Sequence, residues 1–142
     1  MKRMLLGIFA LLAIVVLFAG CGQSSHTNGK LTTPQQAWDA YVSAMKADNA
    51  QSFFGLLSSA YVANLGGAGA SASAALARWK SLLAAPSTYD KVKLLGIQQS
   101  GDQAIVKFTF TDHADYSGQI VLVKEGGAWK VASGTSMKQT GG

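Results

Sequence analysis

The sequence is poor in the residues that form disulfides and metal sites. Its 142 residues include one cysteine, two histidines and seven acidic residues. One cysteine excludes an intrachain disulfide, and so few scattered ligand residues predict no metal site. No glycine pattern follows a predicted strand and opens a helix, so a phosphate-binding loop is not expected either. We therefore expect no metal and no cofactor.

Clusters of basic residues are also missing. The formal net charge of +5 comes from 12 Lys and Arg against seven Asp and Glu. Without Lys2 and Arg3, ten basic residues remain against seven acidic ones, so the rest of the chain is near +3. An excess this small, spread along the chain without a basic run, gives no reason to expect a nucleic-acid partner.

The amino terminus carries the most specific pattern. Lys2 and Arg3 precede an apolar run, Met4 to Ala19, which is shorter than the about 20 residues of a spanning helix. A positive start, a short apolar core and a small-residue exit are typical of a cleavable secretory signal; an uncleaved anchor helix is the alternative. The exit, Phe18-Ala19-Gly20-Cys21, resembles the lipobox of bacterial lipoproteins.

This resemblance implies that the chain is cleaved before Cys21, whose thiol carries a diacylglyceryl group. The new amino group is then a further site of acylation, and two or more acyl chains give stable membrane anchoring. The expected location is the cell envelope, on the outer face of the cell membrane in a Gram-positive source. In a Gram-negative source, Gly22 in place of an aspartate favours the outer membrane, facing the periplasm.

Composition divides the chain into four segments. Residues 1–20 are the predicted signal peptide, and the polar residues 21–32 are the lipidated cysteine with a flexible tether. Residues 33–132 carry the periodic hydrophobic patterns of one domain. The Gly-, Ser- and Thr-rich residues 133–142 are predicted to be a flexible tail.

The first half of the domain has helical periodicity. Thr33, Pro34 and Gln36 are suited to the N-cap, first turn and capping box of a helix. Its predicted buried stripe consists of Trp38, Tyr41, Val42 and Met45. A second helix is predicted from an Asp48 cap to about Leu65, and a third from about Ala72 to Pro86.

After Pro86 the hydrophobic period changes to two. Strands are predicted over residues 89–98, 103–111, 119–124 and 128–132, with a polar loop over residues 112–118. Helices followed by hairpin-connected strands indicate an α+β fold, in which the N-terminal helices pack on an antiparallel sheet of about four strands.

Two segments also resemble a known family. TPQQAWDAYVSAMKADNAQSFFGLLS, residues 33–58, and QIVLVKEGGAWKV, residues 119–131, are similar to the first helices and last hairpin of nuclear-transport-factor-2-like domains. Small exported lipoproteins of unknown function are the nearest sub-group. The resemblance implies a curved sheet wrapped around the first helix as a cone. It also implies that homodimers are common and that some members hold a ligand or an active site in the cone.

Catalytic side chains are scarce in the domain. Family enzymes transfer protons on small ring compounds with Asp, His or Tyr, and this domain has one histidine, His113, beside Asp112 and Asp115. In a predicted loop, turn formation explains these residues better than a catalytic dyad or a metal site, so we assign no catalytic residue. Six aromatic residues remain as candidate pocket lining, although core packing is the favoured explanation for such stripes. They are Trp38, Tyr41, Tyr61, Trp79, Phe108 and Phe110.

Two functions are compatible with these observations. The first is a non-enzymatic binding or interaction module of the envelope, whose partner is a small ligand or an envelope protein. This function follows from the predicted anchor and from the lack of an assigned catalytic residue. A small-molecule isomerase or dehydratase-like enzyme is the alternative, and it rests on fold analogy.

A homodimer and a monomer are both compatible with the sequence. Residues 120–123 are apolar on both faces and only one face can cover the helices, which favours a dimer. Lys107 and Lys124 on the other face favour a monomer, because charge is depleted from interface cores.

Overall fold

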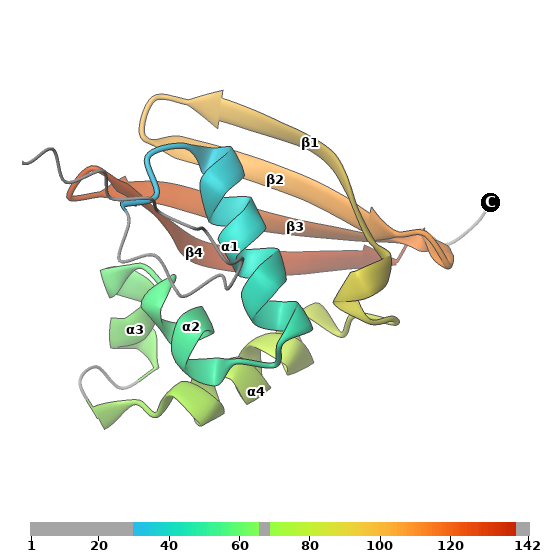
Figure 1. Ribbon diagram of the computed structural model, residues 1–142, viewed down its shortest axis with the longest axis horizontal. Helices are drawn as coiled ribbons and strands as arrows, with labels where there is room; N and C mark the ends of the chain where they lie inside the picture. Colours follow the sequence, from blue (N-terminus) through green and yellow to red (C-terminus); the bar gives the residue numbers. More distant parts are fainter. Residues whose placement is uncertain (1–29, 66–68, 139–142) are drawn as a thin grey trace, which may run out of the picture.

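The computed structural model describes residues 30–65 and 69–138, in which helices precede a single sheet (Figure 1). The helices are α1 (Pro34–Lys46), α2 (Ala50–Gly55), α3 (Ser59–Asn64) and α4 (Ala72–Leu83), followed by a 3-10 turn, η2 (Tyr89–Lys91). The strands are β1 (Val92–Ser100), β2 (Gln103–Phe110), β3 (His113–Glu125) and β4 (Ala128–Lys138). They pair antiparallel in the order β1-β2-β3-β4, and the helices cover one face. This confirms the α+β class and the four-stranded antiparallel sheet.

Helix α1 begins as its sequence predicts. The Thr33 hydroxyl accepts a hydrogen bond from the Gln36 backbone N–H at 3.2 Å, and the Gln36 side chain accepts one from the Thr33 backbone. Pro34 occupies the first turn, where its missing N–H costs nothing. The inward face buries Trp38, Tyr41 and Met45 against the sheet and the other helices, so the predicted stripe is confirmed for these three residues.

The single second helix predicted from Asp48 is wrong. The segment forms two short helices, and the N-cap of α2 is Asn49, whose side chain accepts from the Ser52 backbone. Leu57, between the two helices, forms a parallel β-bridge with Val131 of β4. In this bridge the Ser58 N–H donates a hydrogen bond to the Val131 carbonyl at 2.8 Å. A tertiary pairing therefore interrupts the helix, and Ser58 then caps α3.

The two C-terminal strands are longer than predicted. The predicted loop over residues 112–118 is mostly strand, because β3 begins at His113. The predicted tail over residues 133–142 is strand as far as Lys138, and Thr135 pairs with Gln119. Their polar composition favours loops, but a strand with one face toward solvent also carries polar residues at every second position, as the first half of β3 does here.

Two glycines in these strand segments lie directly under aromatic rings of the core. A Cβ atom on Gly118 of β3 would lie 2.3 Å from Cζ of Phe108, and one on Gly134 of β4 would lie 2.7 Å from Cη2 of Trp79. Both distances are too short for any side chain. The glycines therefore let these two rings lie directly on the inner face of the sheet.

The residues just before α1 are attached to the sheet. The Leu31 carbonyl accepts from the Trp129 backbone at 2.8 Å, and the Thr32 carbonyl accepts from the Trp129 indole at 3.2 Å. Residues 31 and 32 thus belong to the domain rather than to the predicted tether. The predicted signal peptide and Cys21 lie outside the described residues. Among the helices described, none is long and apolar enough to cross a bilayer.

Candidate functional site

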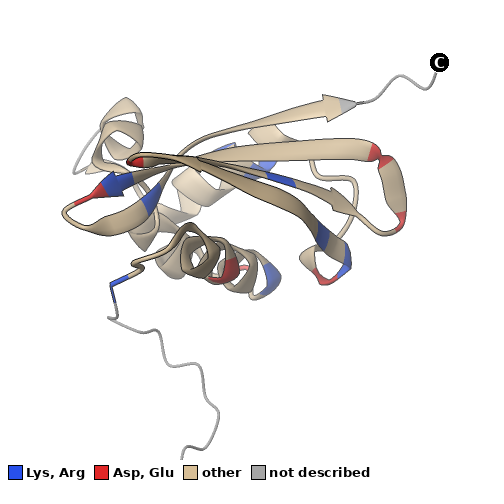
Figure 2. Cartoon of the chain, turned by 90° about the horizontal axis from the view of Figure 1, so that it is seen from above, with Lys and Arg blue, Asp and Glu red and all other residues tan. Residues whose placement is uncertain are grey.

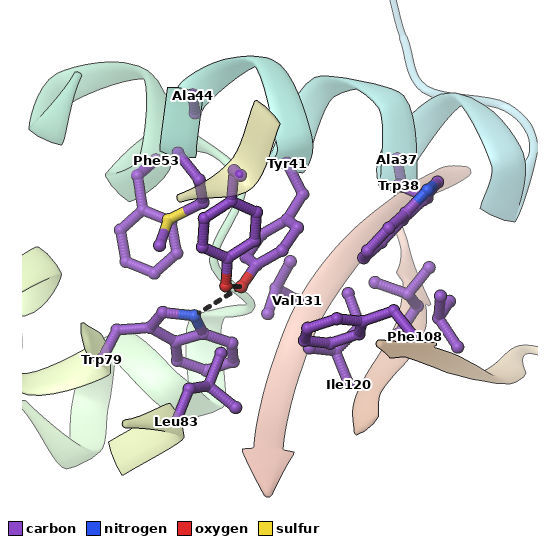
Figure 3. Packing of buried hydrophobic residues seen from close by; sticks show 14 of the residues in the cluster. Ala37, Trp38, Tyr41, Ala44, Phe53, Trp79, Leu83, Phe108, Ile120 and Val131 are labelled. Atoms are coloured by element: carbon purple, nitrogen blue, oxygen red, sulfur yellow. Dashed lines mark hydrogen bonds between the residues drawn. The ribbon is translucent and has the colours of Figure 1, made fainter. Parts of the chain in front are cut away.

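The six aromatic candidates pack on one another between helices and sheet. Trp38 stacks on Tyr41 with ring centroids 5.6 Å apart and lies 5.2 Å from Phe108, as Figure 3 shows from close by. Trp79 and Tyr61 pack in a T-shaped arrangement with ring centroids 5.5 Å apart, and Tyr61 is half-buried and the most exposed of the set. The others are at most 4% exposed. None of the six lines the cavity described below.

A chain of hydrogen bonds runs through this core. The indole Nε1 of Trp79 donates to the Tyr41 hydroxyl at 3.0 Å, and the Tyr41 and Tyr89 hydroxyls lie 2.7 Å apart (Figure 3). If Tyr89 donated to Tyr41, the proton of the fully buried Tyr41 would have no acceptor in the described structure. Such a loss costs about 1–3 kcal/mol. We therefore assign the order Trp79 to Tyr41 to Tyr89, which leaves the spare O–H on Tyr89.

A third buried phenol, that of Tyr116, donates a hydrogen bond to the carboxyl end of a helix. Tyr116 of β3 donates its O–H to the Leu83 carbonyl at 2.8 Å. That carbonyl is in the last turn of α4, where the backbone C=O groups have no N–H donor within the helix. Desolvation raises the pKa of Tyr116 to about 12 and raises the pKa values of Tyr41 and Tyr89 above the usual range. These phenols are protonated at neutral pH, so they act there as donors and not as bases.

A cavity of about 320 Å³ lies where the carboxyl ends of α1 and α4 meet the segment leading into η2. Such a volume is at the small end of the range for ligand sites. Ala84, in a left-handed conformation with φ of 44°, ends α4 and turns the chain along the cavity. The lining residues are Met45, Lys46, Lys80, Leu83, Ala85, Ser87, Thr88, Tyr89 and Asp90.

Charged groups of both signs surround this cavity. Lys80 forms an ion pair with Asp48, and both side chains are largely exposed, so the pair contributes little stability. Lys46 and Asp90 line the cavity as well. Over the rest of the described chain, basic and acidic positions are dispersed without a long strip of one sign (Figure 2).

The His113 group does not form part of the cavity. His113 is half-buried at the start of β3, next to the buried partner Phe110 on β2. The exposed Asp112 carboxylate accepts a 2.7 Å hydrogen bond from the Ser87 hydroxyl, which lowers the pKa of Asp112. Within residues 30–65 and 69–138, no group of three His, Cys, Asp or Glu side chains is arranged to hold a metal ion.

The sequence does not predict the cavity or the buried phenols near it. It predicts a strand at Tyr89, which lines the cavity, and a polar loop at Tyr116, although both are less than 10% exposed. The pattern Tyr116, Gly118, Ile120 and Leu122, all buried, has the period of a strand and could have identified Tyr116. Lys46 and Lys80 are 34 positions apart in the sequence, and no local pattern brings them together.

Comparison with known proteins finds little. No protein-family model matches the chain, and no curated protein matches it. The fold is similar to a solved structure from Thiobacillus denitrificans, described as a candidate calcium/calmodulin-dependent protein kinase type II association domain. The TM-score is 0.48 at 15% identity, over 76% of this chain and 96% of that one. Similarity of this extent is too low to support an inference from one protein to the other.

Proposed function

We propose that the chain is a lipoprotein anchored to the bacterial cell envelope through Cys21, and that its domain binds a ligand without catalysing a reaction. The observation that carries the proposal is the order of features over residues 1–21: two basic residues, a short apolar run and Phe18-Ala19-Gly20-Cys21. A short apolar core with this exit is suited to cleavage and lipidation rather than to a permanent spanning helix.

The position of the cavity is compatible with display from a membrane. Residues 31 and 32, which lead back toward Cys21, lie at the amino end of α1, against Trp129. The cavity lies at the opposite end of α1, a helix of 13 residues. Such a helix is about 20 Å long. The anchored end and the cavity are therefore separated by the length of the domain's first helix.

The side chains around the cavity support binding better than chemistry. A general base needs a pKa near the working pH. Desolvation instead raises the pKa of Tyr89, the phenol in the lining, away from neutrality. The enzymatic alternative, an isomerase or dehydratase, rests on fold analogy alone, and one fold can host many functions.

The anchor is tested by mass spectrometry of the protein isolated from membranes. We expect an amino-terminal peptide that begins at Cys21 and carries a diacylglyceryl group. Cys21→Ser should abolish lipidation and leave the precursor uncleaved, whereas the neighbouring Ser24→Ala should change neither property. A mature protein that retains an unmodified Met1 would contradict the proposal.

A further inference from the structure

Two donor groups without an acceptor line the cavity at the carboxyl ends of α1 and α4. Lys46 is the last residue of α1, and within the described residues no carboxylate forms an ion pair with it. Tyr89 keeps one O–H proton after it accepts the hydrogen bond from Tyr41. An ammonium group and a phenol both donate, and their hydrogen bonds are strongest to an acceptor that carries negative charge.

The other part of the lining is apolar. Met45 is 7% exposed and Ala85 is half-buried, whereas the Leu83 side chain is fully buried and leaves no surface for a ligand. Met45 comes from α1, and Ala85 from the segment after α4. A cavity of about 320 Å³ with an apolar wall holds a small molecule rather than a peptide or a long acyl chain.

Two features oppose an anion in this cavity. Asp90 lines it, and the carboxyl ends of α1 and α4 present the negative ends of their helix dipoles. Of the two lysines in the described lining, Lys80 is paired with Asp48, and Lys46 remains available to a ligand. Charge alone would therefore bind weakly, so contact of an apolar body with Met45 and Ala85 must supply part of the affinity.

We propose that the cavity binds a small monocarboxylate with an apolar body. The carboxylate is held by Lys46 and by the free O–H of Tyr89, and the body lies against Met45 and Ala85. This assignment rests on the proposed binding function and names its ligand class. With opposing charges nearby, a dissociation constant on the order of 1 mM is expected for a minimal ligand.

The test uses nuclear magnetic resonance of the mature lipidated protein in nonionic detergent. Benzoate is titrated against its neutral analogue benzamide, and inorganic phosphate serves as an anion without an apolar body. The Trp79 indole N–H reports occupancy, because it donates to Tyr41 and Tyr41 donates to Tyr89. The Trp129 indole, which donates to the Thr32 carbonyl at the other end of α1, is the reference signal.

Benzoate should shift the Trp79 signal and bind about tenfold more tightly than benzamide, the effect of one charge-assisted contact. Phosphate should leave the signal unchanged. Lys46→Met, which keeps an apolar stem, should remove the preference for benzoate, whereas Lys93→Met on β1, outside the lining, should preserve it. Tyr89→Phe should weaken the binding of benzoate about fivefold or more. An unchanged Trp129 signal would show that this variant is folded.

Three results would overturn the proposal. Equal affinity for benzoate and benzamide, or a preference that survives in Lys46→Met, would show that the cavity does not select carboxylates, while a binding function would stand. A phosphate response as large as that of benzoate would show an anion site without an apolar requirement. No response to either aromatic probe at about 10 mM would exclude this cavity as the ligand site, and the anchor would still be decided by the Cys21 peptide.

Discussion

Replacing Gly118 by alanine should destabilise the domain through a single clash. The new Cβ would lie 2.3, 2.6 and 2.7 Å from three atoms of the Phe108 ring, where ordinary contacts begin at 3.4 Å. The ring would have to move by about 1 Å or more. It is fully buried, and the rings of Trp38, Tyr89, Phe110 and Tyr116 lie around it with centroids 5.2 to 6.4 Å away.

Overpacking of a filled core costs typically about 1–3 kcal/mol, and a ring enclosed on several sides should give a value in the upper half of that range. We therefore expect Gly118→Ala to lower the free energy of unfolding by about 2–3 kcal/mol. The measurement is reversible urea denaturation followed by tryptophan fluorescence, with the slope of the transition checked for constancy.

The matched control is Gly96→Ala in β1, where an added Cβ meets nothing within 4 Å. That change should leave stability unchanged or raise it by up to about 1 kcal/mol, because alanine has less freedom in the unfolded chain. The clash itself is isolated by a double-mutant cycle with Phe108→Leu, and a coupling of at least about 1 kcal/mol is expected. Additive effects, or a loss below 0.5 kcal/mol (about the scatter of such measurements), would refute the reasoning.

Three other outcomes are expected. Trp129→Ala should cost about 3–5 kcal/mol in the same assay, because the ring is 1% exposed and its indole holds the Thr32 carbonyl; a cost below about 1 kcal/mol would contradict this. Stability should fall as the pH rises from 10 to 12, because desolvation raises the pKa of Tyr116 to about 12 on folding and raises the pKa values of Tyr41 and Tyr89 as well. The stabilising contribution is fully present below pH 10, and Tyr116→Phe should make the decline shallower; urea midpoints measured across this range decide. If residues 30–142 form a homodimer through the outer face of the sheet, Val121→Lys should dissociate the dimer in sedimentation without unfolding the protein. Leu122 is fully buried on the inner face, so Leu122→Lys should unfold the protein instead. A monomer at high concentration would exclude the dimer.

The predictions that held were those decided by neighbours in sequence. The capping box of Thr33 and Gln36 and the helical spacing of Trp38 and Tyr41 act within a few residues, so α1 was predictable from its own sequence. The alternation of β2 from Ala104 to Phe110 was equally local. In both elements the spacing of the apolar residues matches the period of the structure that forms, helical in α1 and alternating in β2.

The errors arose where distant segments decide the local structure. The bridge between Leu57 and Val131 ends α2, and no residue within the helix predicts this bridge. The small residues around Gly134 suggested a loose tail, whereas Gly134 itself is small because Trp79 occupies the space a side chain would need. The candidate site was not predicted, because its lining comes from the ends of two helices and from the segment after the second helix.

The pairing of residues 31 and 57 with β4 has a consequence for the order in which the chain folds. Trp129 pairs with the segment before α1, and Val131 pairs with the segment between α2 and α3. Neither pairing can form before the last strand has been synthesised. Contacts between residues so far apart close large loops and slow folding. A chain that ends before β4 leaves the helices without this strand, so we expect the native core to form only after synthesis of the whole domain, and a nascent chain truncated at residue 127 to be digested by protease along its length.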